Sequence, residues 1–486
     1  MNFNDLPSDI QSNIFKYLHP HEWFFAEFVC KTWRTILLEF WDHVKEIEYE
    51  SYGYIRVMFQ DHRSFRLTCS GGGWRDDGDL LMVILKRSGA HVEKLILHIP
   101  QDMNMTLKPE SVLAVGIFCK ELKALSLNGH VSSMADSISV ICHDLLELQE
   151  IFIWDESFPE ETTGEITSGV LVGDIISTCN RLRSLDINFF FIPPPSEDSC
   201  RRLANLENIE RIRWLFWSPL PPAYVETFFS SIVGCKQSLR ELSLSCKLKA
   251  PLNGDKCADS LKQLAETDSR LEILDLGFQL HVAMREENSD EIYYDPIESA
   301  PWTIELLSAL NYFRNINDLS LRYFDLYDDK VLDSLKHVCE NLKVFRLEDN
   351  YGVDGKLTWA LRSYLKKLRA ISISQAYLSH SDMVEFILEC PNLETLRFSN
   401  VDSMSFKRLV LDTHSALHRC GTSYCFGKKN EKISDIHPLN LRLDTARSYI
   451  HDEAEELKNV HLCGLTLSPP GHSNVIIDRV CKGMIG

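Results

Sequence analysis

Residues 122–127 read Leu-Lys-Ala-Leu-Ser-Leu, and the same spacing of apolar residues returns along most of the chain. The last three positions of each copy follow the pattern apolar-x-apolar, which predicts a short β-strand with alternate side chains facing a core. Further copies are indicated at residues 441–443, in degraded form, and at residues 462–467. The clear copies centre on Leu95, Leu125, Ile151, Leu185, Ile212, Leu242, Leu274, Leu319, Phe345, Ile371 and Leu396.

Consecutive centres lie 25 to 34 residues apart, except for one step of 45 residues. A period of this size is typical of repeat proteins in which strands and helices alternate and each repeat packs on the next. Helices are expected between the strands, for example over residues 381–390, which begin with Ser381-Asp382. The sequence therefore predicts an α/β solenoid whose parallel sheet forms the concave face and whose helices form the convex face.

Five of the 15 cysteines share one position relative to this pattern. Cys235 stands four residues before the first apolar residue of a copy, and the others, Cys119, Cys179, Cys339 and Cys390, stand three residues before it. A thiol that recurs there is expected to be a small buried hydrophobe at the end of the preceding helix, and not a metal ligand. This repeat resembles the cysteine-containing class of leucine-rich repeats, and the resemblance implies a horseshoe-shaped leucine-rich-repeat solenoid.

The first 41 residues contain more large apolar side chains than so short a segment can bury by itself. Ile10 and Ile14 recur at helical spacing, and Ser8 and Gln11 have the spacing of a capping box at the start of the same helix. Because exposed apolar patches usually mark partner surfaces, this segment is predicted to be completed by another protein. Three helices are expected, over about residues 8–18, 22–30 and 31–41.

The order and spacing of motifs in residues 5–42 resemble the F-box. The motifs are Leu6-Pro7, Ile14-Phe15-Lys16-Tyr17-Leu18, Val29-Cys30-Lys31-Thr32-Trp33 and Phe40-Trp41. One departure is Trp23-Phe24-Phe25, where the family usually has Asp-Leu-Leu. The alternative is a plain helical cap on the repeat array.

The F-box resemblance implies docking onto a Skp-type adaptor and, through that adaptor, onto a cullin scaffold. Aromatic residues such as Phe15 and Trp33 are typical anchors of such an interface. Some of the apolar residues must instead form the core of the module. The predicted adaptor-binding residues are Leu6, Pro7, Ile10, Ile14, Phe15, Leu18, Val29, Cys30 and Trp33.

The sequence divides into a predicted F-box (1–45), an irregular linker or first repeat (46–90), the solenoid (91–470) and a C-terminal tail (471–486). The 45-residue step contains a charged insertion at residues 285–296 without periodicity. It is predicted to be a solvated loop, with a flap that touches substrate as the alternative.

The chain is acidic, with a formal net charge of −19 from 51 Lys and Arg and 70 Asp and Glu. Such a surface repels phosphate backbones and anionic lipids, so neither nucleic acid nor a membrane is expected as a partner. No signal peptide is recognisable, and no run approaches the roughly 18 to 20 apolar residues of a membrane span. The cysteines are therefore expected to be reduced, in the cytoplasm, the nucleus or both.

Outward-facing strand positions on the concave face are candidates for binding a protein substrate. Phe152 and Trp154 form an aromatic pair there, and Arg322, Arg346 and Arg397 are arginines in the C-terminal repeats. An arginine can bind a carboxylate or phosphate of a bound segment through two hydrogen bonds. The alternative is that these arginines pair with nearby carboxylates such as Glu348.

Other motifs do not support a chemical site. His414, His418, Cys420 and Cys425 lack a clean zinc spacing, and the glycines at 421 and 427, followed by Lys428, do not fit a phosphate-binding loop. No catalytic motif is recognisable. No metal, cofactor or enzymatic activity is therefore expected.

Together the two resemblances imply the substrate-recognition subunit of a Skp–cullin–F-box ubiquitin ligase. Such a subunit binds the adaptor through the F-box and a protein substrate through the repeats, for ubiquitin-dependent protein catabolism. It acts by bringing the substrate close to a ubiquitin-charged enzyme. The alternative is a leucine-rich-repeat protein-binding scaffold without a ligase role.

Overall fold

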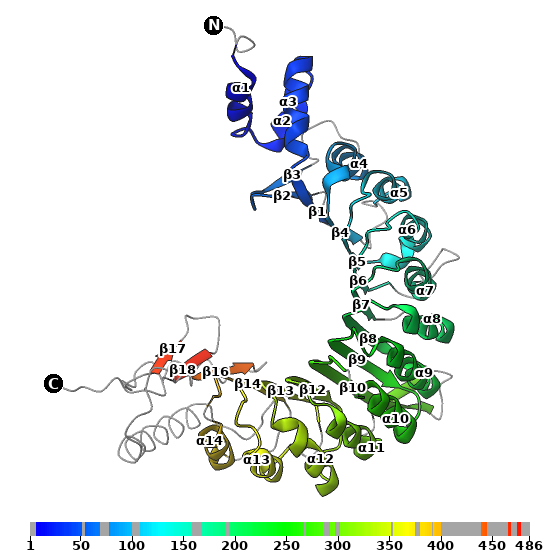
Figure 1. Cartoon of the computed structure of the whole chain (residues 1–486), viewed down its shortest axis with the longest axis vertical. Coiled ribbons are helices and arrows are strands. Elements are labelled where there is room, and N and C mark those ends of the chain that lie inside the picture. The colour runs from blue at the N-terminus through cyan, green and yellow to red at the C-terminus, as the bar shows by residue number, and fades with distance from the viewer. Residues whose placement is uncertain are drawn as a thin grey trace, which may run out of the picture. The chain divides into compact units, whose positions relative to one another are not determined.

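The computed structural model divides the chain into two compact units, Met1–Ser218 and Pro219–Gly486 (Figure 1). The first unit holds the predicted F-box, the predicted linker and the first repeats, and the second unit holds the remaining repeats. The described residues are 6–50, 54–68, 77–99, 107–157, 168–190, 194–266, 269–285, 292–296, 302–350, 353–374, 380–390, 392–399, 439–444, 465–467 and 474–477.

Three short helices form the N-terminal module of the first unit: α1 (Ser8–Phe15), α2 (Pro20–Ala26) and α3 (Lys31–Trp41). The expected capping box of Ser8 and Gln11 is not formed, because Pro7 is the N-cap and its carbonyl accepts the N–H of Gln11. The side-chain amide of Gln11 donates instead to the carbonyl of Leu6 at 2.8 Å. The helix begins where it was predicted, with a different cap.

The stretch expected to be an irregular linker or first repeat contains three strands and a helix. Strand β1 (Val44–Glu50) pairs antiparallel with β2 (Tyr54–Phe59), which pairs antiparallel with β3 (Ser64–Thr68). On its other edge β1 pairs in parallel with β4 (Lys94–Ile99), so that Ile47 lies beside Leu95. Helix α4 (Asp77–Ser88) precedes β4. Strand β1 is therefore the first strand of the parallel ladder.

The parallel ladder of the first unit follows the repeated apolar pattern, which confirms the predicted strands. Its central residues Leu95, Leu125, Ile151, Leu185 and Ile212 are paired in register. The strands after β4 are β5 (Ala124–Gly129), β6 (Glu150–Asp155), β7 (Ser184–Phe189) and β8 (Arg211–Leu220). The helices between them are α5 (Pro109–Phe118), α6 (Ala135–Cys142), α7 (Ser168–Thr178) and α8 (Glu197–Arg202).

The second unit repeats this arrangement, with the strands on one side and the helices on the other (Figure 1). Residues Leu242, Leu274, Leu319, Phe345, Ile371, Leu396 and Leu441 are paired in register across parallel strands. These strands are β9 (Glu241–Leu248), β10 (Ile273–Arg285), β12 (Asp318–Arg322), β13 (Val344–Glu348), β14 (Ala370–Ser374), β15 (Thr395–Ser399) and β16 (Leu439–Asp444). The helices are α9 (Pro222–Ile232), α10 (Gly254–Leu264), α11 (Thr303–Ala309), α12 (Asp329–Cys339), α13 (Gly355–Leu361) and α14 (His380–Glu389).

Two segments differ from the expectation. The charged insertion was expected to be a solvated loop, but its ends form a hairpin in which β11 (Ile292–Pro296) pairs antiparallel with the end of β10. The Ile292-Tyr293-Tyr294 stretch favours a strand because β-branched and aromatic side chains fit a pleated surface. At the C-terminus, β17 (Leu465–Leu467) does not extend the parallel ladder, since β18 (Asn474–Ile477) pairs antiparallel with both β16 and β17.

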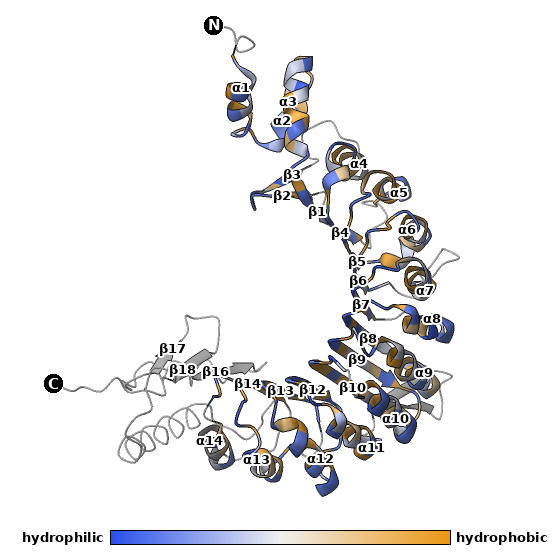
Figure 2. Ribbon diagram, viewed as in Figure 1, coloured by the Kyte–Doolittle hydropathy of each residue, from blue (hydrophilic) through white to orange (hydrophobic). Residues whose placement is uncertain are grey.

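The core of each unit lies between its strands and its helices. The apolar strand residues and the inner faces of the helices are buried there, and hydrophilic residues, blue in Figure 2, cover the outer turns of helices such as α10 and α12. The five recurring cysteines are all buried, as predicted. Burial raises the pKa of Cys119 and Cys235 to about 12, which disfavours the thiolate form that binds metals.

Candidate protein-binding surfaces

Exposed apolar side chains are concentrated on the N-terminal module. Of the 15 large hydrophobic side chains that are exposed in the described part of the chain, six lie within residues 10–29. Phe28 and Tyr17 are the most exposed, at 83% and 91% of their surface. We call the six the N-terminal apolar set: Ile10, Ile14, Tyr17, Phe25, Phe28 and Val29.

The structure separates the predicted adaptor-binding residues into surface and core. Pro7, Ile10, Ile14 and Val29 are exposed, while Leu6, Leu18, Cys30 and Trp33 are partly buried. Phe15, the other predicted anchor, is only 2% exposed, and its ring packs edge-on against Trp33 at 5.1 Å. Phe15 therefore belongs to the core of the module and is not accessible to a partner.

The sequence reasoning missed Tyr17, Phe25 and Phe28. Phe25 belongs to the Trp23-Phe24-Phe25 stretch that departs from the F-box pattern, and Phe28 lies in the turn between α2 and α3. Only Trp23 and Phe24 of that stretch are buried. The Trp23 ring packs against Phe59 of β2 at 5.7 Å, and its Nε1 donates to the carbonyl of Phe15 at 3.1 Å. The departure thus joins the module to the strands that follow it.

A buried ion pair fixes the module to α4. Nε of Arg87 lies 3.0 and 2.9 Å from the two carboxylate oxygens of Glu27, and Nη2 lies 2.8 Å from Oε2. Trp41 Nε1 also donates to Glu27, and the Arg87 guanidinium lies 4.9 Å from the centre of the Phe24 ring. The Glu27 side chain is only 4% exposed. Its buried negative charge is stabilised by the Arg87 cation of α4 and by the Trp41 N–H of the N-terminal module.

A second apolar feature is a row of four aromatic rings on β6, just after β7 and on β8, which we call the aromatic row: Phe152, Trp154, Phe190 and Trp217. Successive ring centres lie 6.5, 5.6 and 5.4 Å apart, and the rings of Phe190 and Trp217 are parallel to within 4°. Trp154 and Trp217 remain exposed, at 36% and 48%. The predicted pair Phe152 and Trp154 is therefore half of a larger surface.

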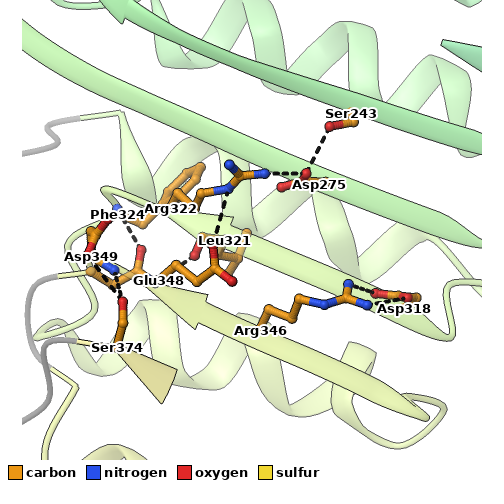
Figure 3. A network of polar contacts seen from close by, with 11 residues as sticks. Ser243, Asp275, Asp318, Leu321, Arg322, Phe324, Arg346, Glu348, Asp349 and Ser374 are labelled. Carbon is orange, nitrogen blue, oxygen red and sulfur yellow. Dashed lines mark hydrogen bonds and ion pairs between the residues drawn. The ribbon is translucent and has the colours of Figure 1, made fainter. Parts of the chain in front are cut away.

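Two of the three predicted arginines, Arg322 and Arg346, are paired with carboxylates of the same chain (Figure 3). Nη2 of Arg322 lies 2.5 Å from Oδ2 of Asp275, and Nε lies 3.8 Å from Glu348. Arg346 donates to both oxygens of Asp318, at 2.5 and 3.2 Å. For these two arginines the structure therefore has the arrangement of the alternative prediction, in which carboxylates of the chain itself neutralise the arginines.

The three arginines are also not gathered at one point. Arg346 and Arg397 lie in one cross-strand row, separated by Ser372, whereas Arg322 lies in the neighbouring row and Arg397 is exposed. Asn350 joins the ends of β12 and β13, because its side chain donates to Leu321 O at 2.7 Å and accepts the N–H of Phe324 at 2.8 Å. Hydrogen bonds of this kind hold the C-terminal ends of the strands in place.

Groups that could hold a metal ion do not occur among the described residues. His414, His418, Cys420 and Cys425 lie outside the described residues, as do Gly421 and Lys428. Within the same described ranges, the helices lack the length and apolar character needed to cross a membrane.

Comparison with known proteins identifies the N-terminal module. Residues 3–46 match the family model described as F-box-like. No curated protein matches the sequence. Among solved structures, the chain is similar to one from the crystal structure of the Rad7 and Elc1 complex in yeast, with 14% identity and a TM-score of 0.41 over 68% of this chain and 75% of that chain. The chain thus carries an F-box-like domain at its N-terminus, followed by strand–helix units of the leucine-rich-repeat solenoid type.

Proposed function

We propose that this chain is the substrate-recognition subunit of a Skp–cullin–F-box ubiquitin ligase. The observation that carries the proposal is the coincidence of the F-box-like domain with the N-terminal apolar set. Solvated apolar side chains cost free energy that a partner surface would recover, at about 25 cal/mol per Å² of apolar surface buried. The partner that fits an F-box-like domain is a Skp-type adaptor, which in turn binds a cullin.

The adaptor would contact the exposed residues of the module, with Phe25 and Phe28 as aromatic anchors. Large aromatic side chains at the centre of an interface commonly provide most of its binding energy. Ile10, Ile14 and Val29 would surround them. The buried pair of Glu27 and Arg87 would hold the bound adaptor at a fixed position relative to the first repeats.

The protein substrate would bind the exposed sheet face of the repeats. A substrate held there and an adaptor held at the module raise the effective concentration of substrate lysines near a ubiquitin-charged enzyme. This chain would then perform no bond chemistry itself. We further assign its repeats to the cysteine-containing leucine-rich-repeat class, on the five buried cysteines, and its location to the cytoplasm, the nucleus or both.

Affinity purification of the tagged full chain from cells tests the proposal. The wild-type chain is expected to recover a Skp-type adaptor together with a cullin, and Phe28→Glu is expected to lose both. Trp359→Glu is the matched control, because Trp359 is equally an exposed aromatic residue, at 65%, but lies in the second unit. Recovery of the adaptor without a cullin would support the scaffold alternative. Recovery of neither by the wild type would contradict the proposal.

A further inference from the structure

The aromatic row is held in place before any partner binds. The two exposed indoles are fixed by hydrogen bonds, since Trp154 Nε1 donates to Glu156 Oε1 at 2.8 Å and Trp217 Nε1 donates to Asn188 Oδ1 at 3.2 Å. Phe190 packs between these two indoles. A surface whose side chains are already ordered loses less conformational entropy on binding, which favours recognition.

A buried carboxylate also fixes the backbone on which Trp154 and Glu156 stand. Asp155 is fully buried. Its Oδ2 accepts from the N–H and hydroxyl of Ser132 at 3.1 and 2.8 Å, and its Oδ1 accepts from the N–H and hydroxyl of Ser157 at 2.9 and 2.6 Å. The Glu156 N–H donates to Gly129 O at 2.8 Å. Both side chains therefore project from a fixed stretch of backbone at the end of β6.

The charge beside the aromatic row is negative. Glu156 is exposed, and no cationic side chain in the described ranges forms an ion pair with it. The whole chain has a net charge of −19. A partner segment that complements this surface in charge is basic.

We propose that the aromatic row binds an extended segment of a partner protein that carries an arginine. The guanidinium would lie against the exposed part of the Trp154 ring and donate to Glu156, whose Oε1 already accepts from the indole. Arginine suits both contacts, because its planar cation stacks on aromatic rings and forms directed hydrogen bonds with carboxylates. The inference rests on the proposed function in one respect, namely that the bound protein is the substrate.

The spacing of the rings sets the length of the bound segment. The two steps that cross the strands, 5.6 Å from Trp154 to Phe190 and 5.4 Å from Phe190 to Trp217, span at most about 11 Å, which matches about three residues of extended chain at about 3.1 to 3.4 Å per residue. Neighbouring apolar residues or prolines of the segment would cover Phe190 and Trp217. Stacked aromatic rings also bind nucleic-acid bases, but the negative charge beside this row opposes a phosphate backbone.

The test measures retention of peptide pools by the immobilised full chain. The pools are Gly-Xaa-Xaa-Z-Xaa-Xaa-Gly with Z fixed as arginine, lysine, citrulline or glutamate. The arginine pool is expected to be retained about tenfold more than the citrulline pool, which has a similar shape without the charge. Trp154→Ala and Glu156→Gln are expected to abolish this difference. Trp359→Ala, which removes an exposed tryptophan that already has Arg362 at 5.3 Å, is expected to leave it unchanged.

Equal retention of all pools by the wild type would overturn the inference, as would a preference for arginine that survives in both Trp154→Ala and Glu156→Gln. Stronger binding of a 20-nucleotide oligo-dT than of the arginine pool would also overturn it, in favour of nucleic acid. Adaptor capture is measured on the same preparations. A chain that prefers arginine but captures no adaptor would contradict the proposed function and leave the peptide site intact.

Discussion

Arg87 of α4 and Glu27 of the F-box-like domain form an ion pair with three nitrogen–oxygen distances of 2.8 to 3.0 Å, in a position where Glu27 is almost completely buried. The two residues are 60 positions apart in sequence. The pair therefore connects the domain to α4, the first helix of the repeats that follow.

Arg87→Ala is expected to destabilise the first unit by about 3 kcal/mol, because it leaves a buried carboxylate without its cation. The double variant Glu27→Leu with Arg87→Met is expected to recover most of the loss, since it removes both charges. Chemical unfolding followed by tryptophan fluorescence measures the difference. Arg63→Ala, which breaks an exposed pair with Asp61, serves as the control and should change stability by less than about 1 kcal/mol. A small effect of Arg87→Ala would show that solvent already screens the pair.

Phe15 and Phe28 are expected to respond in opposite ways to truncation. Phe15→Ala should destabilise the module by about 3 to 5 kcal/mol, because it leaves a cavity beside Trp33. Phe28→Ala should leave stability within about 0.5 kcal/mol and weaken adaptor binding at least about tenfold. Thermal unfolding and calorimetric titration with a purified Skp-type adaptor separate the two effects. An unchanged affinity of Phe28→Ala for the adaptor would show that Phe28 does not contribute to the interface.

Asp155→Ala is expected to loosen the end of β6, where Trp154 and Glu156 stand. The substitution leaves the N–H groups of Ser132 and Ser157 without acceptors in a buried place, at a cost of about 3 kcal/mol. Retention of the arginine peptide pool should fall even though both contact residues are still present. Ser133→Ala, next to Ser132 but exposed, is the control for stability and retention.

The stability of the chain is expected to fall as the pH rises above about 9. Burial raises the pKa of Cys119 and Cys235 from 9.0 to about 12, so the unfolded chain loses these protons at a lower pH than the folded chain. Their contribution is complete below the unfolded pKa and is lost as the pH rises toward the folded pKa. The variant Cys119→Ala with Cys235→Ala should show a shallower decline in unfolding midpoint between about pH 9 and about pH 11. Identical slopes would contradict the role of these two thiols.

The repeated apolar pattern was sufficient to predict the parallel strands, because each strand buries the same positions against the same neighbours. Strand β1 was missed although Val44, Ile47 and Tyr49 have the same apolar spacing, and Ile47 and Tyr49 pair with Leu95 and Leu97. The sequence could not show that the C-terminal ladder ends in antiparallel strands either. That depends on which edge β18 occupies, which no local spacing determines.

The binding surfaces were predicted only in part. Phe152 and Trp154 follow from the strand pattern, but Phe190 lies just beyond β7, and Trp217 lies on the part of β8 that continues past the repeated pattern. The carboxylates that pair with Arg322 and Arg346 lie 47 and 28 residues earlier in the sequence. Likewise, Phe15 ends α1 and Phe28 follows α2 by two residues, and only the packing of Phe15 against Trp33 distinguishes core from surface.

The two antiparallel strands β2 and β3, which precede the ladder in the sheet, have a consequence for self-association. A ladder of similar parallel strands presents an open edge that another copy could extend, as happens in protein aggregates. Here the outermost strand of the first unit is the short β3, which runs antiparallel to β2 and carries Arg66 against the ring of Tyr54. The edge offered to a second molecule is therefore short and carries a charged side chain, two features that disfavour extension of the sheet from one copy to the next.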